Sequence, residues 1–280
     1  MILKRIEYIK NFVLDSKREI LQLFILFICL IAPFLFDFET IIKIILGESS
    51  VNIDNAKYYG LMILGNWFMG CLITLFVLFR FFRSANKEMI FNRGNIYHDK
   101  PYWWYWICSK VLGYEKCNLI LVPIYTQYKL VLRDTFKYYP FDENDFPEQK
   151  CSVVVNKKFN GGLDNQNEIN LIIQDTYPIS EEQIPYNMKS NNEINIKRNC
   201  NSFGERIYSR DLVNKIVEEI RMLDDNLILN IFSTTNPKNT YEIAKKAISL
   251  AQRGNVKHAY VFQQNRDGNR NFDTKPHRIM

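Results

Sequence analysis

Histidine is scarce in this chain of 280 residues, which contains only His98, His258 and His277. None of its six cysteines forms a metal-ligand spacing such as Cys-x-x-Cys. A zinc site would have to be assembled from distant parts of the chain, because neither residue type is clustered. We therefore predict no metal site.

Recognisable catalytic and phosphate-binding motifs are also missing. The sequence has no Gly-x-Ser-x-Gly elbow, no His-Glu-x-x-His pair and no protein-kinase signature. Glycine-rich phosphate loops and the Gly-x-Gly-x-x-Gly fingerprint are absent too. His258 falls within an expected strand, where a packed histidine is commoner than a catalytic base. These absences favour a non-enzymatic protein, and we predict no catalytic residue and no cofactor.

Charged side chains are missing from two long apolar runs. Tyr58–Phe79 carries no charge, and Ile20–Phe36 contains Gln22 as its only strongly polar side chain. A helix needs about 20 apolar residues to cross a hydrocarbon core roughly 30 Å thick. We predict that both runs span a membrane, with Pro33 kinking the first helix rather than preventing it.

Two alternatives to this hairpin are a signal peptide followed by one anchor and a buried hairpin of a soluble protein. The first run starts late for a signal peptide and is longer than the usual apolar core of one. It also lacks a small-x-small cleavage site before Asp37. These features favour two transmembrane helices.

Basic residues near the spans predict their orientation. The loop between the spans, residues 37–57, has two lysines against four acidic residues. The two flanking segments are basic, with Lys4, Arg5, Lys10, Lys17 and Arg18 before the first span and Arg80, Arg83, Lys87 and Arg93 after the second. We predict that both ends of the chain are cytoplasmic. Within the loop, Thr40–Leu46 is expected to extend the first helix, or else to lie along the outer interface.

The remainder of the chain predicts an α/β domain. Short β-branched runs predict strands at Leu119–Ile124, Tyr128–Leu132, Cys151–Val155 and Ile169–Gln174. Residues 180–206 are polar and are expected to form a long surface loop. The order then becomes helix Arg210–Leu223 with Ser209 as its cap, strand Asn226–Phe232, helix Thr240–Gln252 and strand Val256–Phe262. Such alternation predicts parallel strands with right-handed crossovers.

The predicted fold is a membrane α-helical hairpin followed by a cytoplasmic α/β domain with a mostly parallel sheet. The expected segments are a cytoplasmic amino-terminal segment (1–19), the hairpin (20–83), a juxtamembrane aromatic collar (84–117), the α/β domain (118–262) and a basic tail (263–280). The chain has a net charge of +6. The tail is expected to be solvated, with binding to a polyanion or an anionic membrane as the alternative.

Ligands of parallel sheets bind at the carboxyl ends of the strands. Six candidate ligand-binding residues follow two of the expected strands: Asp175, Thr176, Ser233, Thr234, Thr235 and Asn236. Backbone N–H groups at the start of the second helix favour an anion such as phosphate, and Asp175 is a candidate for a ribose hydroxyl or a metal. The alternative is that these residues form a routine helix-capping turn.

Two further groups concern the membrane. Gly65 and Asn66 are predicted to form a helix–helix or inter-subunit contact, because a buried amide in lipid seeks a partner. The alternative is an Asn without functional meaning. In the collar, Trp103, Trp104 and Trp106 are predicted to lie at the membrane interface. Five consecutive aromatic residues cannot share one helix face, so some are expected to pack on the domain. Stacking against a nucleobase is the other possibility.

This layout of the spans Ile20–Phe36 and Tyr58–Phe79 with the α/β body Asp175–Phe262 resembles the two-span effectors of bacterial antiphage systems. Retron-type and cyclic-nucleotide-triggered systems are examples, and the resemblance is one of architecture rather than of any motif. It implies a multi-pass protein of the bacterial inner membrane that disrupts the membrane in abortive infection. It also implies a homo-oligomer, an inhibitory or sensing partner from the same operon, and a nucleic-acid or nucleotide trigger.

Two other functions stay open at this point. A membrane-tethered binding or scaffold module would need the same spans without any disruption of the bilayer. A membrane-attached enzyme that acts on nucleotides would need a catalytic site in the α/β body.

Overall fold

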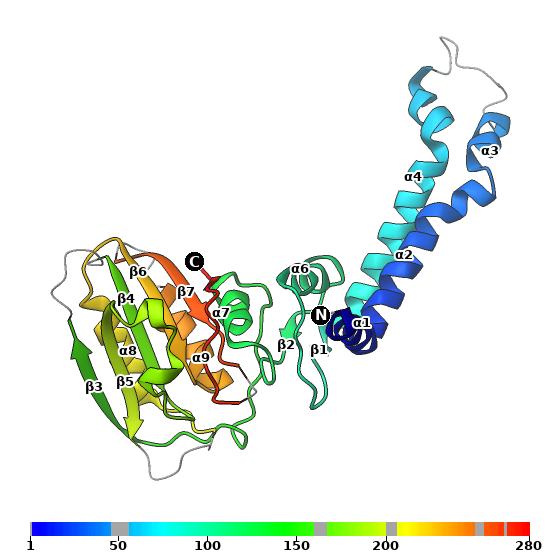
Figure 1. Ribbon diagram of the computed structural model, residues 1–280. Helices are drawn as coiled ribbons and strands as arrows, with labels where there is room; N and C mark the ends of the chain where they lie inside the picture. The colour runs from blue at the N-terminus through cyan, green and yellow to red at the C-terminus, as the bar shows by residue number, and fades with distance from the viewer. Residues whose placement is uncertain (1, 46–55, 160–166, 200–205, 250–254, 266–267) are drawn as a thin grey trace. The chain divides into compact units, whose positions relative to one another are not determined.

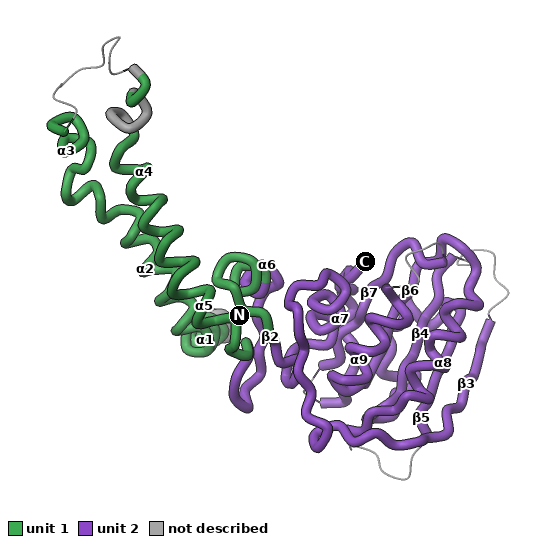
Figure 2. The backbone as a smooth tube through the Cα atoms, turned by 180° about the vertical axis from the view of Figure 1, so that it is seen from behind, with its two compact units in different colours: residues 1–91, 106–116 green, residues 92–105, 117–280 purple. Residues whose placement is uncertain are grey.

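The computed structural model describes residues 2–45, 56–159, 167–199, 206–249, 255–265 and 268–280 (Figure 1). The chain divides into two compact units (Figure 2). Residues 1–91 and 106–116 form the first, which we call the helical unit. Residues 92–105 and 117–280 form the second, which we call the α/β unit. The expected collar, residues 84–117, is therefore shared between the two.

The helical unit is built on a hairpin of two long helices. Helix α1 (Ile2–Asp15) is followed by α2 (Lys17–Leu35) and the short α3 (Phe38–Ile45). Helix α4 (Tyr59–Val77) continues through a π-helical turn, η2 (Leu78–Arg83), into α5 (Ser84–Lys87). α2 and α4 run side by side (Figures 1 and 2). Both predicted spans are thus confirmed as apolar helices long enough to cross a bilayer.

Helix α3 does not continue α2, so the expected helix extension is wrong. The chain breaks at Asp37, which has a φ of +47°. The Asp37 carboxylate then accepts a 2.6 Å hydrogen bond from the Thr40 hydroxyl at the start of α3. An Asp side chain that accepts a hydrogen bond from a residue three positions later caps the start of a new helix, which can then take a new direction. α3 packs against α4 instead.

The α/β unit contains a mixed six-stranded sheet in the order β3-β5-β4-β6-β7-β8. Its strands are β3 (Ser152–Lys158), β4 (Glu168–Gln174), β5 (Asn192–Asn199), β6 (Leu227–Ser233), β7 (Val256–Phe262) and β8 (His277–Arg278). The pairings β5–β4, β4–β6 and β6–β7 are parallel. Both edge strands, β3 and β8, pair antiparallel. The prediction of a mostly parallel sheet is corrected to a mixed one.

The mixed topology arises partly from a strand in the segment that was predicted to be a loop. In β5, Ile194, Ile196 and Arg198 are buried, while the intervening side chains are partly exposed. This alternation has the period of a strand, but Asn, Glu, Lys and Arg occupy most of its positions. The polar composition therefore concealed the strand.

Two of the predicted strands are wrong, because the structure shows a helix and a loop at these residues. Tyr128–Leu132 lies in helix α7 (Ile124–Leu132), which starts after Pro123, and most of Leu119–Ile124 is a loop. A short apolar run does not distinguish a strand from a buried helix. At the other end of the chain, residues 263–280 are not a detached tail. Phe272 and Ile279 are buried, and β8 adds to the sheet.

The two faces of the sheet are covered differently. Helices α8 (Arg210–Arg221) and α9 (Pro237–Ile243, continued by π-helical η7, Ala244–Ile248) lie on one face, and α7 packs beside α9 (Figure 1). On the other face, Ile172, Phe232 and Phe262 of strands β4, β6 and β7 form an apolar cluster with Ile179, Ile184 and Phe272 from the loops that cover them. The predicted Ser209 cap of α8 is confirmed, since its side chain accepts from Leu212 N–H.

The order of the strands creates a topological switch point. From β4 the chain moves to β5 on one side, and then returns to β6 on the other side of β4. Connections that leave two neighbouring parallel strands in opposite directions open a crevice at their carboxyl ends. The candidate site lies at this edge.

Candidate functional site

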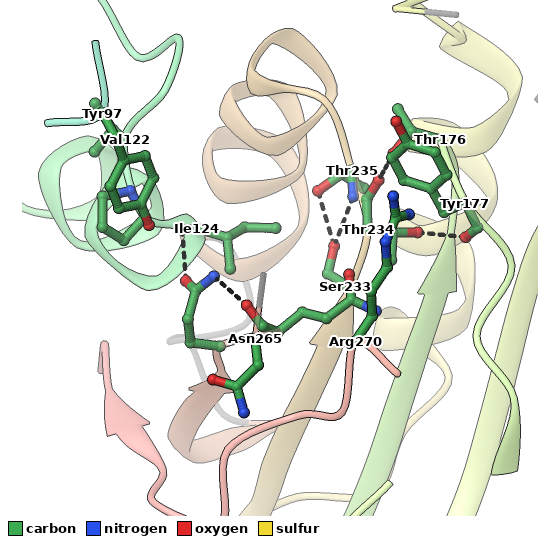
Figure 3. Close-up of a pocket in the computed structure, with 13 residues that line it drawn as sticks. Tyr97, Val122, Ile124, Thr176, Tyr177, Ser233, Thr234, Thr235, Asn265 and Arg270 are labelled. Atoms are coloured by element: carbon green, nitrogen blue, oxygen red, sulfur yellow. Dashed lines mark hydrogen bonds between the residues drawn. The ribbon is translucent and has the colours of Figure 1, made fainter. Parts of the chain in front are cut away.

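A cavity of about 320 Å³ lies at the carboxyl ends of β4, β6 and β7. This volume is at the lower end of the range for small-molecule sites. Figure 3 shows Tyr97 on one side, Thr176 and Tyr177 on the opposite side, and Ser233 to Thr235 between them. The structure thus brings four of the six predicted ligand residues to the cavity wall: Thr176, Ser233, Thr234 and Thr235.

Asp175 and Asn236, the other two predicted residues, lie beneath this wall in a buried polar cluster. The Asp175 carboxylate forms a 2.6 Å ion pair with Arg198, and both side chains are at most 1% exposed. Its second oxygen accepts from Asn236 N–H at 3.1 Å and from Asn239 Nδ2 at 2.8 Å. Burial raises the pKa of Asp175, while Arg198 and the amide donors act in the opposite direction.

Asp175 therefore supplies the anion at the start of α9. The helix opening also uses Asn236 as an N-cap, whose side chain accepts from Asn239 N–H at 3.0 Å. The backbone N–H groups of Asn236 and Asn239, which were predicted to be available to a phosphate, are therefore already hydrogen-bonded within the protein. The cluster fixes the two loops that form the cavity wall, since Arg198 also donates to the Asp175 carbonyl at 3.1 Å.

The hydroxyl groups of the wall are also engaged within the protein. Thr234 donates to the Tyr177 carbonyl at 2.7 Å, and Thr176 donates to the Thr234 carbonyl. Ser233 and Thr235 share a hydrogen bond of 2.8 Å. The hydroxyls therefore make the wall rigid, and their remaining lone pairs can accept but add few donors.

Two donors that the sequence reasoning did not select face the cavity from the carboxyl-terminal segment. The Arg270 guanidinium lies over the Tyr177 ring, 4.2 Å from its centroid. The Gln264 Nε2 group is buried and has no hydrogen-bond partner within the described part of the chain. None of the described residues that line the cavity is acidic. The site is therefore set up to receive an acceptor or an anion.

Metal binding has no comparable support. No group of three or more His, Cys, Asp or Glu side chains could hold a metal ion among the residues that the structure describes. His258 lies in β7, where its Nδ1 is 3.0 Å from an Arg278 guanidinium nitrogen.

In the hairpin, Gly65 and Asn66 lie against α3 rather than α2. The Asn66 side-chain oxygen accepts from Glu39 N–H at 3.0 Å, near the amino-terminal end of α3. A Cβ atom on Gly65 would come within 2.8 Å of Ile42 Cδ1. The neighbouring Leu64 departs from helical geometry, with φ −114° and ψ 17°. This contact holds α3 at a kink in α4.

Helices α2 and α4 approach each other closely at Gly70. A Cβ atom there would lie 2.3 Å from the Leu30 carbonyl oxygen, which cannot move without displacing the backbone of α2. Small residues allow such close packing of membrane helices. Both helices still direct large apolar side chains outward, including Phe24, Phe27, Leu72, Leu75 and Phe76.

A family comparison agrees with this combination of an apolar hairpin and an α/β unit. The model of the SMODS- and ubiquitin system-associated 2TM effector domain matches residues 4–280 of the chain. The chain belongs to this family. It is thus a two-span effector of the antiphage type, associated with SMODS and ubiquitin-like systems. No curated protein matches the chain.

The 2TM effector also contains a buried polar network at the base of its hairpin. Asn86 in α5 exchanges two hydrogen bonds with Gln22 in α2, of 2.9 and 3.1 Å, and donates to the Leu112 carbonyl at 2.9 Å. Tyr114 donates to Glu19 at 2.6 Å, and burial raises the pKa of this tyrosine. The network joins α2 to both segments that follow α4. Gln22, the only strongly polar side chain of the first span, was the available signal for it.

Some aromatic side chains of the collar are exposed and others are buried. Helix α6 (Tyr102–Trp106) continues into a π-helical turn, η3 (Ile107–Val111). Trp103 and Trp106 are about half exposed, whereas Trp104 and Tyr105 are buried. Exposed tryptophans are common at membrane interfaces, and that position stays a prediction for Trp103 and Trp106. Trp104 packs edge-to-face against Trp103.

Proposed function

We propose that this 2TM effector disrupts the bacterial inner membrane when its α/β unit is triggered, and so causes abortive infection. The observation that carries the proposal is the hairpin: two closely packed helices whose large apolar side chains point outward. In our proposal both chain ends are cytoplasmic, because the segments that flank the hairpin are rich in lysine and arginine.

Among the described residues, the hairpin by itself offers no polar path through a bilayer. No charged residue lies between Tyr58 and Phe79, and Asn66 is already bonded to α3. Intramembrane polar or charged side chains normally mark ion pathways. We therefore propose that disruption requires several hairpins, which makes the active form a homo-oligomer. An inhibitory or sensing partner from the same operon would keep the hairpins apart before infection.

The cavity of the α/β unit is the proposed trigger site. Arg270 and Gln264 offer donors, and the lining residues that the structure describes include no acidic side chain, which favours an anionic ligand. A space of about 320 Å³ fits a ligand of nucleotide size better than a nucleic-acid strand. We propose a nucleotide as the trigger.

Induced expression in bacteria tests the effector function directly. Expression without the neighbouring genes is expected to collapse the membrane potential, measured with a potential-sensitive dye, and to arrest growth. Co-expression of the partner genes should prevent both effects. Growth arrest with an intact potential would instead favour an enzymatic α/β unit, and no toxicity in either case would favour a tethered scaffold.

Nucleotide binding is tested by isothermal titration of the full chain in detergent micelles with nucleoside monophosphates. Arg270→Gln is expected to weaken binding by about 10- to 100-fold, because a hydrogen bond to a charged group contributes about 1.5–3 kcal/mol. Arg278→Gln is the matched control, since Arg278 lies outside the cavity. Equal losses in both variants would place the ligand elsewhere, and tighter binding of single-stranded RNA than of nucleotides would argue against a nucleotide trigger.

A further inference from the structure

Helix α1 has an apolar stripe that the described part of the protein leaves exposed. Ile6, Ile9 and Val13 are 57%, 52% and 44% exposed. Their spacing of three and four residues places them on one face of the helix. Asn11 is also exposed and lies on the opposite side, two positions from Ile9. Tyr8 and Leu14 are also exposed and lie at the two edges between these sides. The helix is therefore amphipathic, with its apolar side open.

The orientation of α1 within the helical unit indicates what its apolar stripe contacts. α1 ends at Asp15 and α2 begins at Lys17, with only the buried Ser16 between them. In both Figure 1 and Figure 2, α1 is seen along its axis, whereas α2 and α4 run across the picture. α1 thus turns away from the hairpin axis instead of lengthening it. When α2 stands across a bilayer, α1 extends sideways from its end.

We propose that α1 lies in the plane of the membrane, at the boundary between headgroups and acyl chains of the leaflet where α2 begins. The stripe of Ile6, Ile9 and Val13 faces the acyl chains, and Asn11 faces water. Exposed apolar side chains on a helix with basic residues are the pattern of an interfacial helix. The partner is lipid because only one residue, Ser16, joins α1 to α2, the helix that crosses the same bilayer.

Charge determines which lipids this surface favours. Lys10 on α1 and Lys17 at the start of α2 are exposed, whereas the neighbouring Arg18 donates to Asn86 Oδ1 at 3.0 Å. Basic groups at this depth lie beside the phosphates and attract anionic headgroups. The proposed surface therefore binds phosphatidylglycerol in preference to phosphatidylcholine. The inference requires only that α2 spans a bilayer, so it can fail or hold independently of membrane disruption.

Photo-crosslinking of the full chain tests the proposal. p-Benzoylphenylalanine is incorporated at position 9 or, as the matched control, at position 11, and the protein is reconstituted into vesicles of phosphatidylcholine with or without phosphatidylglycerol. After irradiation, mass spectrometry of the amino-terminal peptide is expected to show several-fold more phospholipid adduct at position 9 than at position 11. The adduct at position 9 should contain phosphatidylglycerol above its share of the vesicle lipid.

Two results would overturn the assignment. Equal lipid adducts at both positions, or none at either, would show that α1 does not lie in the interface with this face down. A dimer adduct at position 9 in place of lipid would show that a second copy of the chain covers the stripe. The crosslinking residue at position 9 should not disturb folding, because the side chain that it replaces is already exposed.

Discussion

Arginine in place of both Leu64 and Leu75 is expected to abolish the toxicity of the effector. These side chains are 55% and 47% exposed on the outer surface of α4. In a bilayer they face lipid or another hairpin, and an arginine in a span costs up to about 2.5–3.5 kcal/mol, the value at the centre of the helix. Dye-reported membrane potential and colony counts after induction measure the effect. A loss of killing by several orders of magnitude is expected.

The control for this prediction carries methionine at the same two positions, because Leu→Met conserves volume and apolarity. It should remain as toxic as the unmodified chain. Membrane extraction with carbonate then separates two causes, since the arginine variant either leaves the membrane fraction or stays there without disrupting it. An arginine variant that still kills cells would transfer the activity to the α/β unit. Release of the unmodified chain by carbonate or high salt alone would remove the membrane premise.

The sequence was informative where one physical requirement dominated. A bilayer demands long runs without charge, so both spans could be placed to within a few residues of α2 and α4. Strands β4 and β6 are mostly apolar and almost wholly buried, as strands covered on both faces are, and they were predicted together with β7, which exposes Lys257. β5 lies in the same sheet but was missed, because Arg198 and its polar neighbours find partners that only the tertiary structure supplies.

The position of the candidate site could be predicted from the sequence, but the roles of its individual residues could not. The switch-point rule pointed to the ends of β4 and β6, and the cavity lies there. From the sequence, Asp175 is a plausible ligand-binding residue, because no lysine or arginine lies near it in the chain to neutralise its charge. Its partners Arg198 and Asn239 lie on β5 and α9, and only folding brings them together. Arg270 and Gln264 reach the cavity because the last segment folds back on the sheet, which its basic composition did not indicate.

Removal of Arg198 is expected to destabilise the α/β unit more than loss of any exposed charge. Arg198→Met conserves much of the apolar volume but leaves the Asp175 carboxylate buried without its cation. Breaking a buried ion pair by removing one partner costs about 3–5 kcal/mol. The loops of residues 175–177 and 233–236 should also lose their fixed geometry, because the same carboxylate holds Asn236 and Asn239. Pulse proteolysis of the full chain in detergent micelles, over a range of urea concentrations, measures the loss.

Arg210→Met supplies the matched control for this last prediction. Arg210 pairs with Glu148 at 3.1 Å, and both side chains are more than half exposed. An exposed pair contributes about 0–1 kcal/mol, so this variant should unfold almost like the unmodified chain. If both variants lost the same small amount, the Asp175–Arg198 pair would not be the element that holds the cavity wall in place. A large loss in Arg198→Met that is partly restored by adding Asp175→Asn would show that the uncompensated carboxylate is its cause, since that change removes the buried charge.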